Sequence, residues 1–195
     1  MSLQRTYSGT KPRFHIPPGA VDTQLHMYLE GFPALPGGPP LPPGLPGPAE
    51  YRQVMAWLGI ERLVITQGNA FQHDNSCLLA CLEIMGPIAR GVAVITPDMP
   101  MKQLQSLHDA GIRGARIMDL PGGAVGMKDL AAVDALAAAM GWCIAVQFDG
   151  NDIVQHLPAL KALKSRYIID HHGKFFAGAT PDSAEVDALK SLIDR

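Results

Sequence analysis

Short runs of apolar residues alternate with longer amphipathic segments from about residue 19 to the end of the chain. The apolar runs are nearly free of charge, as is typical of parallel strands buried on both faces. We expect strands at 21–26, 62–67, 91–95, 114–118, 143–148 and 167–170. We expect helices at 49–58, 76–85, 101–110, 128–140, 152–163 and 182–193.

Glycine directly follows four of the expected helices, where a residue with positive φ is favoured. These glycines are Gly59, Gly86, Gly111 and Gly141. Six β/α units of this kind predict either a doubly wound sheet or a barrel. No Gly-x-Gly-x-x-Gly follows the first strand, and polar residues follow every strand. We therefore favour an α/β fold of the (β/α)8 TIM-barrel type, with about six of the eight units present.

The chain is expected to contain an N-terminal arm, residues 1–18, and an incomplete barrel domain, residues 19–195. Within the domain, residues 33–48 hold eight of the seventeen prolines and four glycines. A linker between domains is one interpretation, but too little chain precedes this segment to form a domain. We expect an extended surface loop that borders the functional site.

Composition and charge narrow the class of partner. The 195 residues can bury one sizeable core. The net charge of −2 does not favour binding to nucleic acid or to an anionic membrane. No apolar run approaches the ~20 residues that span a bilayer. The three cysteines lie within apolar runs and are expected to be buried free thiols. Without a signal peptide, this cysteine usage predicts a cytoplasmic protein.

In a barrel enzyme the catalytic residues lie at the carboxyl ends of the strands. In this chain the residues at those ends are polar. The candidate catalytic residues are His26, His171 and Arg116. The candidate substrate-binding residues are Gln24, Tyr28, Gln67, Asn69, Gln147, Asp149 and Lys174. Each carries a hydrogen-bond donor or acceptor or an acid/base group, as a pocket for a polar small molecule requires.

Arg116 stands inside an otherwise apolar strand, where an unpaired cation would be costly. A structural ion pair with a neighbouring acid would explain it. A bidentate clamp on a substrate carboxylate or a developing oxyanion would explain it equally well. Both interpretations stay open at this point.

The histidines that directly follow the last expected strand are consecutive, so within a strand they would face opposite sides. We expect His171 to enter the site and His172 to be structural. Asp170 is expected either to orient an imidazole or to cap the following loop. His26 also has a structural interpretation, because orienting hydrogen bonds alone can account for a polar residue there.

The first strand argues against a bound metal. Many metal hydrolases begin with a strand that ends Asp-x-His-x-His, whereas this one reads Asp22-Thr-Gln24-Leu-His26. An amide oxygen is a poor zinc ligand beside imidazole or thiolate. We therefore expect no metal and no other cofactor. A zinc ion held by His26, His171 and an acid is the alternative.

Five segments of the chain resemble those of the amidohydrolase superfamily. They are 19–28 (GAVDTQLHMY), 65–70 (ITQGNA), 114–123 (GARIMDLPGG), 146–150 (VQFDG) and 170–176 (DHHGKFF). The chain is most similar to the branch that contains 2-pyrone-4,6-dicarboxylate lactonase and D-galactarolactone isomerase, and more to the isomerase than to the lactonase. The resemblance covers nearly the whole chain and supports the barrel.

The resemblance implies a small carboxylated lactone as the substrate and no requirement for a divalent metal. The expected reaction converts a galactarate-type 1,5-lactone into the 1,4-lactone by intramolecular acyl transfer. Hydrolysis of a carboxylated lactone is the first alternative, and an inactive, truncated ligand-binding barrel is the second. A homo-oligomer is compatible with these expectations.

Members of this family continue through two further strands, and the eighth usually supplies an acid. The chain ends before either, so we expect a barrel lacking its last quarter. An open barrel leaves strand edges unpaired, which is unfavourable. We therefore expect an isolated monomer of 195 residues to be unstable or inactive unless a partner chain covers the gap.

Overall fold

The computed structural model describes residues 12–193, so residues 1–11 of the expected arm lie outside the described part. The strands are β1 (Val21–Leu25), β2 (Arg62–Thr66), β3 (Ala89–Ala93), β4 (Ile112–Met118), β5 (Cys143–Gln147) and β6 (Tyr167–Ile169). The α-helices are α1 (Pro48–Leu58), α2 (Ser76–Met85), α3 (Met101–Asp109), α4 (Leu130–Ala139), α5 (Ile153–Lys161) and α6 (Ala184–Ile193). The 3-10 helices are η1 (Asn69–Phe71), η2 (Gly86–Ile88), η3 (Met127–Asp129), η4 (Gly150–Asp152) and η5 (Asp170–Gly173).

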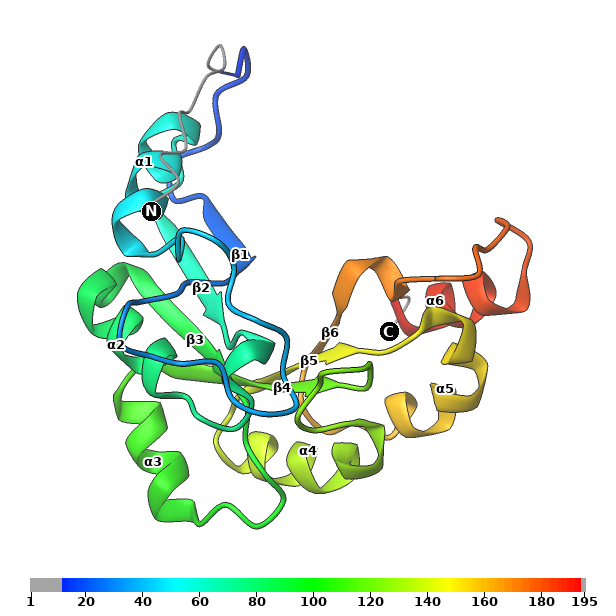
Figure 1. The fold of residues 1–195 in the computed structure, drawn as a ribbon. Coiled ribbons are helices and arrows are strands. Elements are labelled where there is room, and N and C mark those ends of the chain that lie inside the picture. Colours follow the sequence, from blue (N-terminus) through cyan, green and yellow to red (C-terminus); the bar gives the residue numbers. More distant parts are fainter. Residues whose placement is uncertain (1–11, 194–195) are drawn as a thin grey trace.

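The order of the strands decides between the two predicted architectures. The six strands form one sheet in the order β1-β2-β3-β4-β5-β6, and each neighbouring pair is parallel. A doubly wound sheet would reverse its strand order at a switch point, whereas a barrel keeps the sequence order. The sheet curves into an open part of a barrel (Figure 1). The TIM-barrel prediction is confirmed, with six β/α units.

The helices α2 to α5 lie along the outer side of the curved sheet (Figure 1). The apolar side chains of strands and helices meet between these two layers. The largest fully buried side chains there include Leu63, Ile65, Leu104, Ile117 and Ile144. Burial of such side chains contributes roughly 1.5–3 kcal/mol each, so this layer holds the strands in register. Their carboxyl ends are thereby positioned along a common rim.

The expected elements agree with the structure except near some ends. The third strand begins and ends two residues earlier than expected. Directly after its end, Asn75 forms hydrogen bonds with both the N–H and the C=O of Val94. The helices expected at 128–140 and 152–163 begin as η3 and η4 before they become α4 and α5. The four glycines expected after helices all have positive φ.

The loop rich in proline and glycine, residues 33–48, lies against the carboxyl ends of the central strands. The N–H of Leu35 donates to the C=O of Ala70 in η1. The side chain of Gln72 donates to the C=O of Gly122, in the loop that follows β4. A Cβ added at Gly38 would lie 2.4 Å from the C=O oxygen of Asn69, so only glycine fits against η1. This loop therefore contacts the segment that carries Asn69.

Among residues 12–193, β1 and β6 each pair with one strand only. Exposed apolar side chains lie on both, at Val21 and Ile168. No helix in this part of the chain is long and apolar enough to cross a membrane.

Candidate functional site

Side chains from the two edge strands meet across the concave side of the sheet. The Nε2 of Gln24, in β1, donates to Oδ2 of Asp170, directly after β6, at 2.9 Å. These residues are 146 positions apart in the sequence. The curvature of the sheet therefore brings the carboxyl ends of the first and last described strands to one place. Arg116 of β4 lies close enough for its charge to affect the titration of His26.

Arg116 is buried and held by neutral oxygens. Its side chain is 3% exposed. Its Nη1 donates to the C=O of Gln67 at 2.6 Å and to Oδ1 of Asn69 at 2.9 Å. Its Nη2 donates to Oε1 of Gln147 at 2.9 Å, while Nε has no partner. Three acceptors without charge thus fix the orientation of a buried cation.

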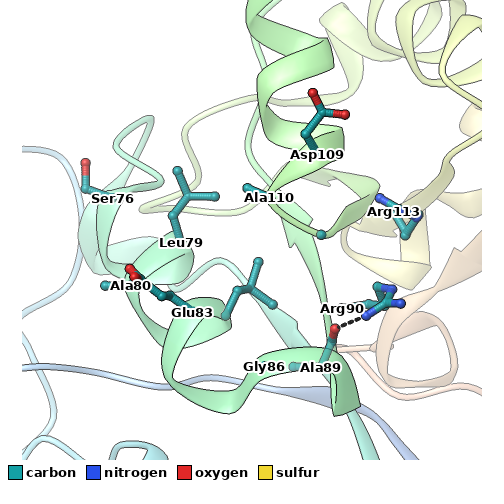
Figure 2. Close-up of a pocket in the computed structure, with 12 residues that line it drawn as sticks. Ser76, Leu79, Ala80, Glu83, Gly86, Ala89, Arg90, Asp109, Ala110 and Arg113 are labelled. Carbon is teal, nitrogen blue, oxygen red and sulfur yellow. Dashed lines mark hydrogen bonds between the residues drawn. The ribbon is translucent and has the colours of Figure 1, made fainter.

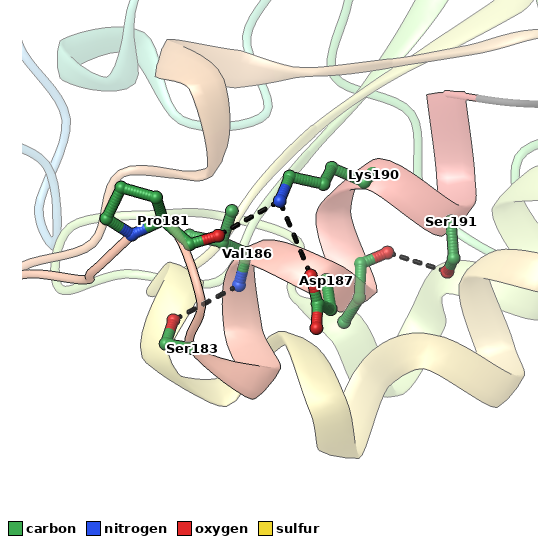
Figure 3. Close-up of polar contacts among 7 residues, drawn as sticks. Pro181, Ser183, Val186, Asp187, Lys190 and Ser191 are labelled. Carbon is green, nitrogen blue, oxygen red and sulfur yellow. Dashed lines mark hydrogen bonds and ion pairs between the residues drawn. The ribbon is translucent and has the colours of Figure 1, made fainter.

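No carboxylate forms an ion pair with Arg116. Across residues 12–193 the structure has one ion pair, between Lys190 and Asp187 on the exposed face of α6 (Figure 3). Burial lowers the pKa of Arg116, and the charge of Asp170 opposes that shift from a longer distance. A guanidinium with a lowered pKa still carries its proton at neutral pH. The structural ion-pair interpretation is therefore not supported, and the substrate clamp stays a prediction.

The imidazole of His26 has a defined tautomer when it is neutral. Its Nδ1 lies 2.8 Å from the C=O of Thr66. A carbonyl oxygen only accepts hydrogen bonds, so Nδ1 must carry the proton and Nε2 is left with a free lone pair. Desolvation by the surrounding protein is the main cause that lowers the pKa of His26, although the residue as a whole is exposed to solvent. A neutral imidazole with an open Nε2 is suited to accept a proton near pH 7.

Two of the predicted substrate-binding glutamines form hydrogen bonds with other protein groups of the site. Gln147 is 3% exposed and uses its amide oxygen to bind Arg116. Gln67 binds the C=O of Asp74 through Nε2 at 2.7 Å, which fixes the loop that follows β2. The backbone of Gln67 and the side chain of Asn69 also hold Arg116. Their places at strand ends were predicted, but their contacts are with the protein.

Asp170 is the residue whose contact sequence reasoning missed. It is 2% exposed, and its Oδ1 has no hydrogen-bond partner. The two expected roles were orienting an imidazole and capping a loop, whereas the structure shows a bond to the amide of Gln24. The signal in the sequence was the position directly after the sixth apolar run.

The segment that follows Asp170 is a turn and not a continuation of the strand. β6 ends at Ile169, and His171, His172 and Lys174 have φ of 54°, 53° and 51°. The argument that the two histidines face opposite sides of a strand is therefore wrong. Both histidines are exposed, and His171 lies close enough to influence the pKa of His26. His172 lines a separate groove beside β6 and α6, about 660 Å³ in volume.

The three remaining candidates are Tyr28, Asp149 and Lys174, and each has different neighbours. Tyr28 packs against Phe71 with ring centroids 5.7 Å apart, and burial raises its pKa. Asp149 accepts a hydrogen bond from the N–H of Asn151 at 3.0 Å and so caps η4. The Nζ of Lys174 lies 5.4 Å from the centroid of an exposed phenylalanine ring. Of the three, Tyr28 is the one coupled electrostatically to Arg116.

The described residues do not fit a resident divalent metal. In residues 12–193 no group of three or more His, Cys, Asp or Glu side chains is arranged to hold one. At the first-strand position Gln24 offers an amide oxygen where an imidazole would stand, and an amide oxygen is a poor zinc ligand. Independence from a metal stays a prediction.

A surface groove of about 770 Å³ lies at the other end of the sheet, between α2 and α3 (Figure 2). It is lined at the amino ends of β3 and β4 by Arg90 and Arg113. None of the predicted site residues takes part in it. Their chemistry gathers at the carboxyl ends, as in other barrels.

Comparison with known proteins gives a consistent result. Residues 12–195 match the family model described as Amidohydrolase. The chain is 57% identical over 194 residues to a D-galactarolactone isomerase of Agrobacterium fabrum, covering 99% of this chain and 66% of that protein. It is 29% identical over 173 residues to a 2-pyrone-4,6-dicarboxylate hydrolase of Comamonas testosteroni, covering 85% and 55%.

The apo crystal structure of an Agrobacterium tumefaciens protein superposes on the chain with a TM-score of 0.91 at 56% sequence identity. The match covers 94% of this chain and 68% of that one. The chain thus spans about two thirds or less of the length of the two curated relatives. The sequence similarity extends across every element described above.

Proposed function

The chain belongs to the amidohydrolase family, and we propose that it acts on carboxylated sugar lactones as an isomerase. The reaction would convert the 1,5-lactone of a galactarate-type diacid into the 1,4-lactone. Similarity to a D-galactarolactone isomerase at 57% identity supports this substrate class. The geometric observation that carries it is a buried guanidinium without a carboxylate partner, close to a neutral imidazole with an open Nε2.

The proposed chemistry is an intramolecular acyl transfer that consumes no water. The C4 hydroxyl loses its proton to a base and attacks the lactone carbonyl at C1. A tetrahedral intermediate forms, with negative charge on the former carbonyl oxygen. The bond between C1 and O5 then breaks, and O5 takes up a proton. Such a sequence needs one base, one acid and a cation or donors at the oxyanion.

The residues divide between these tasks as follows. His26 is the proposed base, because its Nε2 is unprotonated in the tautomer that Thr66 imposes. His171, exposed beside it, is the proposed acid for the leaving oxygen. Arg116 would bind the oxyanion or the free carboxylate of the substrate, and in either position its fixed charge lowers the barrier. No metal or other cofactor enters this proposal.

The remaining candidate residues would bind the parts of the substrate away from the reacting carbonyl or would support Arg116. Tyr28 and Gln24 offer a hydroxyl and an amide near Arg116, and Lys174 offers a second cation for a carboxylate at the rim. Gln67, Asn69 and Gln147 would support Arg116, which their contacts favour over direct binding. Asp149 would act through the turn that it caps.

Hydrolysis of the same class of lactone is the second candidate function. The relative from Comamonas testosteroni is a hydrolase, and a water molecule in place of the internal hydroxyl would pass through a similar tetrahedral intermediate. The two reactions differ in their products. Isomerisation yields a second lactone, whereas hydrolysis yields an open diacid and releases acid.

The test is incubation with D-galactaro-1,5-lactone, with the product identified by ¹³C NMR. The chain is assayed alone and together with the third of the Agrobacterium fabrum isomerase that has no counterpart here. A 1,4-lactone formed faster than in buffer supports the proposal. An open diacid supports the hydrolase instead. Unchanged substrate in both samples would contradict both functions.

A further inference from the structure

Asp170 and Gln24 form a buried pair whose atoms can be assigned. A carboxylate at neutral pH only accepts hydrogen bonds, so its 2.9 Å contact with Gln24 must be made by the NH2 group of the amide. The amide oxygen, Oε1, is consequently turned away from Asp170. That oxygen has no hydrogen-bond partner in residues 12–193, and it is not among the buried polar atoms. It is an accessible acceptor of fixed orientation.

The fixed orientation has a chemical consequence for a ligand. An acceptor oxygen binds a hydroxyl group, which donates, and gives nothing to a carboxylate or carbonyl, which only accept. Without Asp170, the amide of Gln24 could rotate by 180° and present its NH2 group instead. A site that offers a fixed acceptor discriminates strongly against a ligand that lacks the matching donor.

We propose that Asp170 is a positioning residue that holds Gln24 with its amide oxygen toward the substrate, and so makes the site selective for hydroxylated lactones. This inference rests on the proposed function, because it concerns the substrate of the same site. Sugar-diacid lactones carry ring hydroxyls that can donate to Gln24. Unsaturated lactones such as 2-pyrone-4,6-dicarboxylate have no ring hydroxyl that could donate to this oxygen.

The surroundings of Asp170 support a role beyond packing. Its Oδ1 is buried without a partner, and a buried unpaired acceptor is costly enough to need an explanation. Three ionisable side chains influence the titration of His26, namely Arg116, Asp170 and His171. Arg116 and His171 lower the pKa of His26, whereas Asp170 raises it. The carboxylate therefore opposes the effect of Arg116 and His171 on His26.

The first test measures this electrostatic effect without turnover. The pKa of the His26 imidazole is followed by NMR in the 195-residue chain and in Asp170→Asn, a substitution that preserves shape. We expect a lower pKa in Asp170→Asn, because the carboxylate that favours the imidazolium is lost. The variant Gln24→Ala keeps the carboxylate and should leave the pKa of His26 near its original value. An unchanged pKa in Asp170→Asn contradicts the inference.

The second test measures KM for the hydroxylated substrate. With the galactarolactone as substrate, Asp170→Asn should raise KM by roughly fivefold, because the amide of Gln24 is no longer held in one orientation. Gln24→Ala should raise KM by a similar factor, and the double variant should show little further increase. Equal KM values in the original chain and in both single variants would overturn the selectivity.

A matched control variant and the comparison of the pKa with KM test these conclusions. Asp109→Asn removes an exposed carboxylate at the other end of the sheet and should change neither the pKa nor KM. If the original chain converts no lactone but the pKa of His26 falls in Asp170→Asn, the proposed function and the selectivity fail, and only the electrostatic effect of Asp170 on His26 stands. If conversion occurs while Asp170→Asn leaves both quantities unchanged, the positioning fails and the function stands.

Discussion

Strand β4 carries two arginines three residues apart, and they lie in opposite environments. Arg113, near the amino end, is exposed and donates to the backbone C=O groups of His108 and Ile112 at 2.7 Å each. Arg116, near the carboxyl end, is buried among amide and carbonyl oxygens and lacks a partner for Nε. The register of β4 against β3 shifts at Arg113, so alternation alone does not decide the two faces. Arg113 lines the groove between α2 and α3, whereas Arg116 binds groups at the carboxyl ends of the strands.

The difference between the two arginines separates the amino end of the sheet from its carboxyl end. An exposed guanidinium that binds carbonyl oxygens loses little hydration and gains little stability. A buried guanidinium without a carboxylate has lost its hydration and is only partly compensated, which costs stability. Such a cost is expected where an anionic ligand completes the charge pairing. We therefore expect a ligand at the carboxyl end of the sheet, although a groove of about 770 Å³ lies at the other end (Figure 2).

The largest effect is expected from removing the buried arginine. Arg116→Ala should lower kcat/KM for the lactone by roughly a thousandfold, a magnitude typical for loss of an oxyanion-stabilising group. Arg116→Lys keeps the charge without the planar fork and should recover only part of the loss. The measurement is steady-state kinetics beside thermal unfolding, so that a folding defect is recognised.

Arg113→Ala is the matched control on the same strand. It removes a guanidinium of equal size from the amino end and should change kcat/KM by less than about twofold, as is usual for surface substitutions. Equal losses in Arg113→Ala and Arg116→Ala would remove the distinction between the two ends.

The next effect concerns the proton acceptor. Because burial lowers the pKa of His26, its neutral form persists below the ordinary value of 6.5. The rate should therefore stay constant as the pH falls to 6.5 and decline only at a lower pH, where the imidazole becomes protonated. His26→Ala should lower kcat by about a hundredfold or more and abolish that decline.

His73→Ala serves as the control, because this histidine is exposed in a loop. It should preserve both the rate and the pH profile. A profile that declines well above pH 6.5 in the original chain would show that another group limits the rate.

The places of these residues could be predicted from the sequence, but their partners could not. The apolar runs define where each strand ends, so Arg116 and Gln147 were correctly placed in strands of a barrel. That Gln147 binds Arg116 depends on the reach of a long side chain across to the neighbouring strand, which periodicity does not encode. The pairing of Gln24 with Asp170 depends on the curvature of the whole sheet. Local patterns contain no information about a contact across 146 positions.

The turn after β6 was misjudged for a related reason. The residues Asp170-His171-His172 continue an apolar run and look like the end of a strand. In the structure a neighbouring turn determines their conformation, because the N–H of Gly150 donates to the C=O of Lys174. Positive φ in three residues other than glycine is imposed by such tertiary contacts and not by residue type.

That contact makes Gly150 the next test of the carboxyl end. A Cβ at Gly150 would lie 2.2 Å from the C=O oxygen of Gly173, so Gly150→Ala must separate the two turns. We expect destabilisation by about 1–3 kcal/mol, seen as a lower midpoint of thermal unfolding, together with reduced turnover because His171 moves. Gly141→Ala, two residues before β5 and so at its amino end, meets no atom within 4 Å and strains only φ. It should cost about 1 kcal/mol and leave kcat unchanged.

The smallest effect is expected from the exposed ion pair of α6. Lys190 binds Asp187 at 3.4 Å and the C=O of Pro181 at 3.0 Å, on the outside of the molecule (Figure 3). Both charged side chains are largely hydrated, so their attraction is offset by solvation and side-chain entropy. Asp187→Asn should change the free energy of unfolding by less than about 0.5 kcal/mol and leave kcat/KM unchanged. A loss comparable with that of Arg116→Ala would mean that charge pairing, and not burial of an unpaired cation, distinguishes the functional end of this sheet.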